Sequence, residues 1–172
     1  MMKNISLSLF FISFISILNA QKSNDFTLKS ANGSETFTLS SARGKYVALH
    51  FLLKTECPYC IRHTNDYAAK AASLPNVIQV FIKPDDEQDI KNWTSKLSSS
   101  TQEAFPIYQD INASLADRFK IPAGYAFHGQ SVHYPALILL DKKGREVFRY
   151  VGKNNSDRFS FDQLKSKMSE LN

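Results

Sequence analysis

The feature that most constrains the fold is a largely apolar run, residues 46–53, that stands only three residues before Cys57-Pro58-Tyr59-Cys60. A run of this length and composition predicts a buried strand, and Pro58 suits the first turn of a helix. The sequence therefore predicts a strand that leads into a Cys-x-x-Cys motif at a helix N-terminus. The unpaired N–H groups and the dipole at such a terminus stabilise a thiolate, the reactive form of cysteine.

Cys57 and Cys60 are the only cysteines of the chain, so each can pair with the other, with a partner protein or with a small thiol. This spacing near a βαβ pattern is typical of a redox-active pair. Two other interpretations stay open. A static structural disulfide would close a loop too short to stabilise the fold much. Half a zinc site with His63 as a third ligand would lack the second cysteine pair that such sites normally use.

The N-terminal residues have the pattern of an export signal. Lys3 precedes an apolar stretch, residues 5–18, and Ala20 suits the position before a cleavage site. The stretch is too short to span a bilayer comfortably. We therefore expect residues 1–20 to be a signal peptide and residues 21–172 to be one domain, periplasmic or secreted, with a bacterial envelope as the favoured location. A retained anchor helix is the alternative.

Charge and motif content exclude several classes of function. The formal net charge of +5 is dispersed, with no long basic run, which indicates solubility rather than nucleic-acid binding. No Ser–His–acid order or glycine-rich phosphate loop supports a hydrolase or a nucleotide-binding protein. We expect no metal, no nucleic acid, no stable membrane insertion after signal cleavage, and a monomer.

Hydrophobic periodicity and turn signals predict the remaining elements. Early strands alternate with helices, which implies parallel crossovers, and the last two strands form a hairpin. The sequence predicts a mixed sheet with helices on both faces and the cysteines at the C-terminal end of a central strand, where α/β sheets carry their sites. The expected elements are a hairpin around Asn32-Gly33, strands at 46–53, 77–82, 135–140 and 146–151, an extended piece at 105–108, and helices at 61–72, 87–98, 113–119 and 161–171, with an aromatic- and histidine-bearing loop at 121–133.

Four segments carry a resemblance to a known family: residues 26–47, the strand with its cysteine pair, residues 134–145 and residues 150–153. Together they resemble the redoxin group of thioredoxin-fold proteins, the AhpC/TSA and TlpA-like thiol–disulfide oxidoreductases. The resemblance implies a thioredoxin-like α/β fold, a mixed central sheet flanked by helices, with an N-terminal β-hairpin extension. It also implies a redox-active disulfide, Cys57–Cys60, and no other cofactor.

The same resemblance implies roles for residues outside the cysteine pair. In this family the proline that begins the late strand is cis and lies against the cysteines, which places Pro135 there and turns the backbone of Tyr134 toward an extended substrate. An ordinary trans proline on an edge strand is the alternative. We therefore expect Pro58, Tyr59, Tyr134 and Pro135 to contact substrate.

The chain also departs from its relatives. Glu56 stands where such redoxins often carry Trp, and Pro58-Tyr59 is the dipeptide of glutaredoxins, although no glutathione clamp is visible. Peroxiredoxins use a Thr three residues before their cysteine and a distant Arg. Here Lys54 holds the first position, and no arginine lies between Arg118 and Arg145.

These departures favour thiol–disulfide exchange with protein or small-thiol substrates and a thiol electron donor. In this mechanism Cys57 attacks a substrate disulfide and Cys60 resolves the mixed disulfide. A peroxiredoxin-like thiol peroxidase, which would lack organised donors for the departing oxygen, and a secreted binding module on a redoxin scaffold are the alternatives. The sequence leaves open whether the pair reduces or oxidises its substrates.

Overall fold

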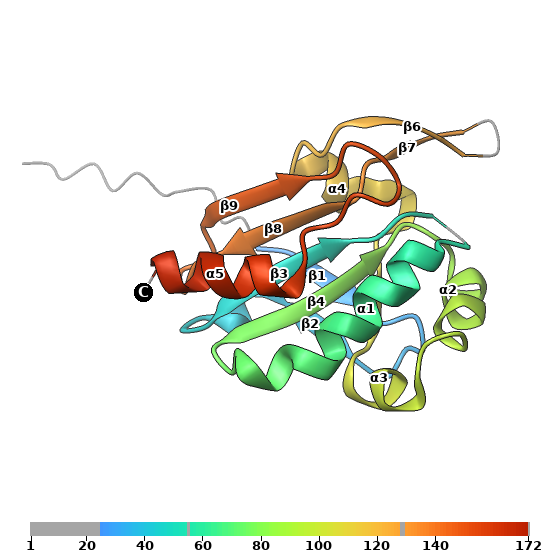
Figure 1. Ribbon diagram of the computed structural model, residues 1–172. Coiled ribbons are helices and arrows are strands. Elements are labelled where there is room, and N and C mark those ends of the chain that lie inside the picture. The colour runs from blue at the N-terminus through green and yellow to red at the C-terminus, as the bar shows by residue number, and fades with distance from the viewer. Residues whose placement is uncertain (1–24, 55, 128–129, 172) are drawn as a thin grey trace, which may run out of the picture.

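The computed structural model describes residues 25–54, 56–127 and 130–171, so the expected signal peptide lies outside the described residues. Its centre is a five-stranded sheet with the order β5-β4-β3-β8-β9 (Figure 1). Strands β3, β4 and β5 run parallel to one another, and β8 and β9 add antiparallel pairs beside β3. The predicted mixed sheet is thus confirmed. The strands are β3 (Tyr46–Phe51), β4 (Val77–Lys83), β5 (Ile107–Gln109), β8 (Ala136–Leu140) and β9 (Glu146–Val151).

Helices carry the parallel crossovers. α1 (Pro58–Lys70) and the 3-10 turn η2 (Ala71–Ser73) connect β3 to β4. The next crossover contains two helices, α2 (Glu87–Thr94) and α3 (Ser99–Ala104), where the sequence predicts one helix over 87–98. The break has a local cause, because the Ser98 hydroxyl accepts a hydrogen bond from the Thr101 N–H and so caps a new helix.

Both faces of the sheet are covered, as predicted. One core contains side chains of α1, α2 and α5 (Phe161–Leu171), among them Tyr67, Trp93 and Leu164. The other lies under the antiparallel pair of β1 (Thr27–Lys29) and β2 (Thr36–Thr38), the 3-10 turn η1 (Leu39–Ala42), η3 (Ile111–Ala113) and α4 (Ser114–Arg118) (Figure 1). All residues of β3 are buried between these layers, which explains why this strand reads as an uninterrupted apolar run.

The segment expected to be a loop at 121–133 contains a second antiparallel pair, β6 (Ala123–Phe127) and β7 (Gln130–His133). Its small residues Ala123, Gly124 and Ala126 have low strand propensity, which hid the strand in the sequence. The pair lies at the end of the sheet where β3 and β4 terminate (Figure 1). Within the described part of the chain, no helix combines the length and the apolar character needed to cross a membrane.

Candidate active site

The two cysteines lie where β3 gives way to α1. Cys57 is the N-cap residue of α1, and Pro58 follows in its first turn. The Cys60 N–H donates a hydrogen bond of 3.1 Å to Cys57 Sγ, and a disulfide joins the two residues across a Cα–Cα distance of 5.1 Å. Cys57 is 6% exposed and Cys60 is 0% exposed. The helix N-terminus therefore contacts the sulfur that is easier to reach.

The residue before Cys57 takes a strained backbone conformation. Glu56 has a φ of 35°, in the left-handed region that costs a residue with a Cβ roughly 1–2 kcal/mol. Its side chain is exposed. The carboxylate at the position that relatives give to Trp therefore faces solvent.

A buried cation fixes the end of β3. Lys83 Nζ donates a hydrogen bond of 2.7 Å to the carbonyl oxygen of Leu53 and lies 3.0 Å from a carboxylate oxygen of Asp85. Both charged side chains are 0% exposed, and the ammonium group lies 4.7 Å from the centre of the Trp93 ring. Burial lowers the pKa of Lys83, and the charge of Asp85 opposes that shift. The chain just before the cysteines is thus held to the end of β4.

Arg158 brings a positive charge to the cysteine pair. Its Nη2 donates to Cys60 Sγ at 3.2 Å and to Cys57 Sγ at 3.4 Å. A guanidinium at this distance stabilises a thiolate and lowers the pKa of the thiol that forms it. Arg158 was not among the site residues predicted from the sequence, because it lies in the connection between β9 and α5 with no motif of its own.

The connection that carries Arg158 is held at several points. Gly152 N–H donates a 2.8 Å hydrogen bond to the Pro135 carbonyl. The Asp157 carboxylate accepts hydrogen bonds from the Tyr150 hydroxyl and, at 2.9 Å, from the Lys153 N–H. These bonds fix the backbone on the N-terminal side of Arg158.

The C-terminal side of Arg158 is held as well. Tyr67 of α1 donates a 2.8 Å hydrogen bond from its hydroxyl to the Phe159 carbonyl, and the Phe159 ring is buried. Backbone anchors on both sides therefore position a long, flexible side chain over the sulfurs.

The expected cis bond at Pro135 is wrong. The Tyr134–Pro135 peptide is trans, as are all peptide bonds within the described residues. Trans is the lower-energy form of an X–Pro bond by roughly 0.5–1 kcal/mol. Pro135 nevertheless lies near the site, because it lines a small cavity together with Arg158 and His63.

The backbone of Tyr134 is engaged within the chain. Its N–H donates to the Pro122 carbonyl at 3.0 Å, and its carbonyl accepts a 2.7 Å hydrogen bond from Nδ1 of His133. A Cβ built on Gly124 would lie 3.5 Å from the Tyr134 ring, so the ring packs over β6. The hydrogen-bonding groups that were expected to pair with an extended substrate are therefore occupied.

Three polar side chains form a hydrogen-bonded chain behind Cys60. His63 Nε2 and His50 Nδ1 are 3.0 Å apart, and His50 Nε2 lies 2.8 Å from Gln79 Oε1. The ring of Tyr67 packs against both imidazoles, with centroids 4.5 Å from each. Burial lowers the pKa of His50 to about 4 and the pKa of His63 well below its usual value, and both are therefore neutral at neutral pH.

A groove of about 450 Å³ lies beside the cysteines. Tyr59 lines it with 37% of its surface exposed, and the guanidinium of Arg62 lies 5.2 Å from the centre of the Tyr59 ring. Asp66, the groove's carboxylate, is paired with Lys70 at 2.7 Å. The lining residues are Tyr59, Arg62, His63, Asp66, Ser156, Arg158 and Ser160.

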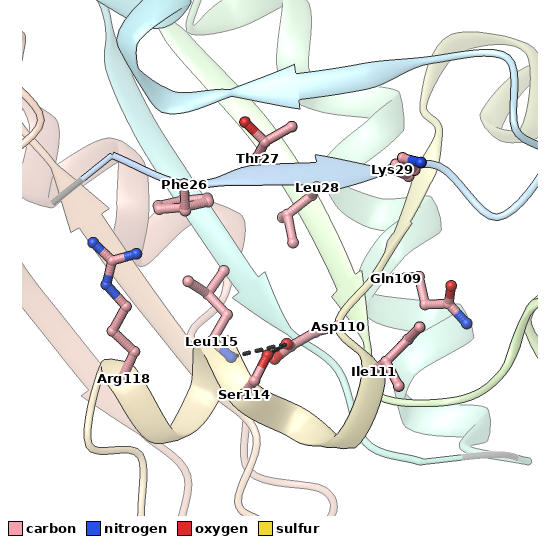
Figure 2. A pocket seen from close by; sticks show the side chains of 10 residues that line it. All are labelled: Phe26, Thr27, Leu28, Lys29, Gln109, Asp110, Ile111, Ser114, Leu115 and Arg118. Carbon is pink, nitrogen blue, oxygen red and sulfur yellow. Dashed lines mark hydrogen bonds between the residues drawn. The ribbon is translucent and has the colours of Figure 1, made fainter.

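A larger hollow of about 540 Å³ lies elsewhere, between β1 and α4 (Figure 2). In it Asp110 accepts hydrogen bonds from the N–H groups of Leu115 and Ala116, which satisfies the start of α4. None of the predicted site residues lines this hollow. Within the described residues, no cluster of three or more His, Cys, Asp or Glu side chains is arranged to hold a metal ion.

Comparison with known proteins agrees with this geometry. A model of the AhpC/TSA family matches residues 20–147. The chain belongs to the AhpC/TSA family. Members of this group with the thioredoxin fold work through cysteine thiols without a cofactor, so the chain is a redoxin whose Cys57–Cys60 pair can form a disulfide. No curated protein matches the chain.

Solved structures show the same fold. The exposed lipoprotein thioredoxin Etrx1 of Streptococcus pneumoniae has a TM-score of 0.66 at 23% identity, with coverage of 86% of this chain and 99% of that one. Peroxiredoxin Q of Xanthomonas campestris has a TM-score of 0.69 at 18% identity, with coverage of 86% and 92%. A secreted disulfide oxidoreductase of Mycobacterium tuberculosis has a TM-score of 0.61 at 22% identity, with coverage of 85% and 96%. The predicted thioredoxin-like fold is confirmed, and these neighbours are named as a thioredoxin, a peroxiredoxin and a disulfide oxidoreductase.

Proposed function

We propose that the protein is an exported thiol–disulfide oxidoreductase that works through Cys57 and Cys60. The observation that carries the proposal is the contact of Arg158 with both sulfurs of a disulfide at the N-terminus of α1. A helix terminus and a guanidinium both favour a thiolate over a thiol. They therefore favour the form of cysteine that attacks disulfides.

The reaction follows from the exposure of the two sulfurs. The Cys57 thiolate attacks one sulfur of a substrate disulfide, and the other substrate sulfur leaves as a thiolate. Cys60 then loses its proton and its sulfur attacks Cys57 Sγ, the mixed disulfide breaks, and the second substrate sulfur leaves. Two electrons pass from the cysteine pair to the substrate, and a thiol electron donor restores the pair. The reverse sequence oxidises a substrate dithiol.

The groove beside the pair is the proposed substrate site. Tyr59 lines the groove, the preceding residue Pro58 is exposed, and Arg62 and Arg158 make the groove electropositive. Pro135 contributes from the cavity behind Arg158, and Tyr134 contributes through packing of its ring rather than through its backbone. The expected substrates are protein disulfides or dithiols and small thiols.

Trapping experiments test the assigned roles. Cys60→Ser is expected to accumulate mixed disulfides with substrates, because the resolving sulfur is gone, whereas Cys57→Ser is expected to trap little. Acceleration of insulin reduction by dithiothreitol tests the activity of the intact protein. If the trapping pattern is reversed, the roles are wrong. If the purified protein does not accelerate the reaction, the alternative of a secreted binding module gains support.

Peroxidase activity is a second candidate, and Arg158 is the specific observation that favours it. The sequence places no arginine between Arg118 and Arg145, but the structure brings Arg158 to the sulfurs from beyond that stretch. A guanidinium beside a thiolate is a donor for a departing peroxide oxygen. Stopped-flow oxidation of the reduced protein by hydrogen peroxide separates the candidates: an exchange enzyme reacts like an ordinary low-pKa thiol, and a peroxidase reacts several orders of magnitude faster.

Export is proposed from residues 1–20. Expression of the full chain in a bacterial host, followed by N-terminal mass determination of the periplasmic protein, tests the expected cleavage after Ala20. Size-exclusion chromatography with light scattering tests the expected monomer. A full-length protein that remains with the membrane fraction would support the anchor alternative.

A further inference from the structure

The two histidines lie close to the cysteine pair, His50 buried and His63 half-buried. His63 lies three residues after Cys60 on α1, and side chains at this spacing are neighbours on one helix face. His63 also lines both hollows that adjoin Arg158, the groove and the smaller cavity with Pro135. His63 is therefore close to the cysteines and is accessible from the groove beside them.

The placement of Gln79 Oε1 against His50 Nε2, with Gln79 Nε2 buried and without a partner, defines one assignment of the ring protons. In this assignment Gln79 Oε1 accepts and His50 Nε2 donates, and a neutral His50 then has a bare Nδ1. His63 Nε2 must donate to that Nδ1. A neutral His63 whose proton is on Nε2 keeps a lone pair on Nδ1. No hydrogen bond to Nδ1 of His63 is found within the described residues, so this atom is the free base of the chain.

We propose that His63 transfers the proton of the resolving cysteine, and that His50 and Gln79 are positioning residues that hold it in the required tautomer. This inference rests on the proposed disulfide exchange. The histidine accepts a proton at Nδ1 in one step and returns it in the next. Neither His50 nor Gln79 contacts the reacting sulfurs in this scheme; they act through His63.

The proton that Cys60 loses passes through His63 to the leaving substrate thiolate, and the two electrons pass from the cysteine pair to the substrate. After the mixed disulfide forms, the Cys60 thiol gives its proton to His63 Nδ1 as its sulfur bonds to Cys57 Sγ. The bond between Cys57 Sγ and the substrate sulfur breaks, and the substrate leaves as a thiolate. That thiolate takes the proton from the His63 imidazolium. In the opposite direction, the imidazolium protonates Cys60 as it leaves the disulfide.

The surrounding charges suit a short-lived proton on His63. Burial lowers the pKa of His63 most, and the nearby His50 and the Arg158 charge lower it further. The His63 imidazole is therefore unprotonated at neutral pH and can accept a proton. A thiol is normally too weak an acid for such a base. Arg158 reduces the mismatch from the side of the thiol, because its Nη2 lies 3.2 Å from Cys60 Sγ and stabilises the thiolate that remains. Tyr67, the other titratable ring packed on His63, stays protonated because burial raises its pKa.

A two-phase reaction with an aromatic disulfide isolates the step. Reduced protein and 5,5′-dithiobis(2-nitrobenzoate) release one coloured thiolate when Cys57 attacks and a second when Cys60 resolves. The aromatic thiolate leaves without taking up a proton, so the only proton transfer in the second phase is the loss of the Cys60 proton. The rate of this phase therefore reports deprotonation of Cys60. We expect His63→Ala to slow the second phase relative to the first by about 100-fold, the scale of general base catalysis.

Added imidazole distinguishes proton transfer from packing. His63 lines the open groove, so imidazole can enter the space that His63→Ala leaves, and the second phase should recover with imidazole concentration. Thr64→Val is the matched control, because Thr64 is the next buried residue of α1 and its replacement keeps the volume. The control should change neither phase. If His63→Ala does not fold, His63→Gln takes its place in the test. Gln conserves a donor to His50 but accepts no proton from a thiol, so the second phase of this variant should also be slow.

Each outcome has one meaning. A second phase as fast in His63→Ala or His63→Gln as in the wild type overturns the proposal. A slow phase that imidazole does not restore, or that Thr64→Val reproduces, also overturns it, because it assigns His63 to packing. Absence of a second phase in the wild type itself is a failure of the proposed disulfide exchange and not of the histidine assignment alone.

Discussion

Nη2 of Arg158 lies 3.2 Å from Sγ of Cys60, although 98 residues separate them along the chain. Replacement by Met keeps much of the apolar stem and removes the charge. We expect Arg158→Met to raise the pKa of the Cys57 thiol by about 1–3 units, the usual effect of an opposite charge at this range. The pH dependence of iodoacetamide alkylation of the reduced protein measures it. Arg62→Met is the control, because Arg62 lies over Tyr59 instead. If the pKa of the Cys57 thiol is the same in Arg158→Met and Arg62→Met, Arg158 does not stabilise the thiolate.

Gly152 permits the close approach of two segments beside the site. A Cβ at this position would lie 2.3 Å from the Asp157 carbonyl oxygen and 2.8 Å from Pro135 Cγ. Gly152→Ala must therefore displace the connection that holds Arg158. We expect a loss of roughly 1–3 kcal/mol in the free energy of unfolding, as for other overpacked sites, together with slower disulfide exchange.

Urea denaturation with the insulin assay measures both effects of Gly152→Ala. Gly33→Asn is the control, since no atom lies within 4 Å of a Cβ at Gly33, and Asn tolerates its φ of +72°. Native stability and activity in Gly152→Ala would contradict the steric argument.

The Lys83–Asp85 pair is buried, and replacement of Lys83 removes the cation that lies 3.0 Å from the buried Asp85 carboxylate. We expect Lys83→Met to cost roughly 3–5 kcal/mol of unfolding free energy. Trp93, the single tryptophan, packs against the ammonium and reports unfolding by fluorescence. Lys91→Met breaks the exposed pair with Glu87 and is expected to cost less than about 1 kcal/mol. Equal losses in the two variants would show that burial of the pair does not matter.

The neutral state of His50 predicts an acid-sensitive fold. The pKa of His50 is about 4 in the folded protein, against an ordinary value of 6.5 once the chain unfolds, so the unfolded chain binds more protons between these values. Stability from this group is complete above pH 6.5 and is lost as the pH falls toward 4, by about 3 kcal/mol in total. Urea denaturation between about pH 7.5 and 4.5 measures the slope. In His50→Asn the slope should be shallower; an unchanged slope would assign acid sensitivity to other groups.

The strand, the cysteine pair and the helix start were predictable because their signals are local. Residues 46–51 are buried on both faces, which a continuous apolar run records directly. The N-cap position of Cys57 follows from Pro58 next to it. By contrast, the contact of Arg158 with the sulfurs depends on where a distant connection crosses α1, and no pattern in the sequence encodes that position.

The polar chain behind Cys60 depends on register. His50 and Gln79 meet because β3 and β4 are parallel with Ala48 opposite Gln79 and His50 opposite Phe81. In the sequence, His50 and Gln79 are each a single polar residue within an apolar strand, and nothing local indicates that the two side chains meet. The error at Pro135 has a different origin, because the cis bond was implied by the family resemblance rather than by neighbouring residues. In this chain Tyr134 has partners for its N–H and carbonyl in Pro122 and His133.

The occupied backbone of Tyr134 bears on which partners the protein accepts. Because these backbone groups are occupied, a partner forms no strand pairing with Tyr134 and does not need an unfolded segment to do so. In the proposed disulfide exchange, a folded protein and a small thiol are therefore both suitable partners in this respect. Cys57 is 6% exposed, which limits the approach of a disulfide to its sulfur. In the proposed disulfide exchange, how far a partner's disulfide protrudes then decides whether it reacts, a property of shape that a digest of unfolded peptides would not reveal.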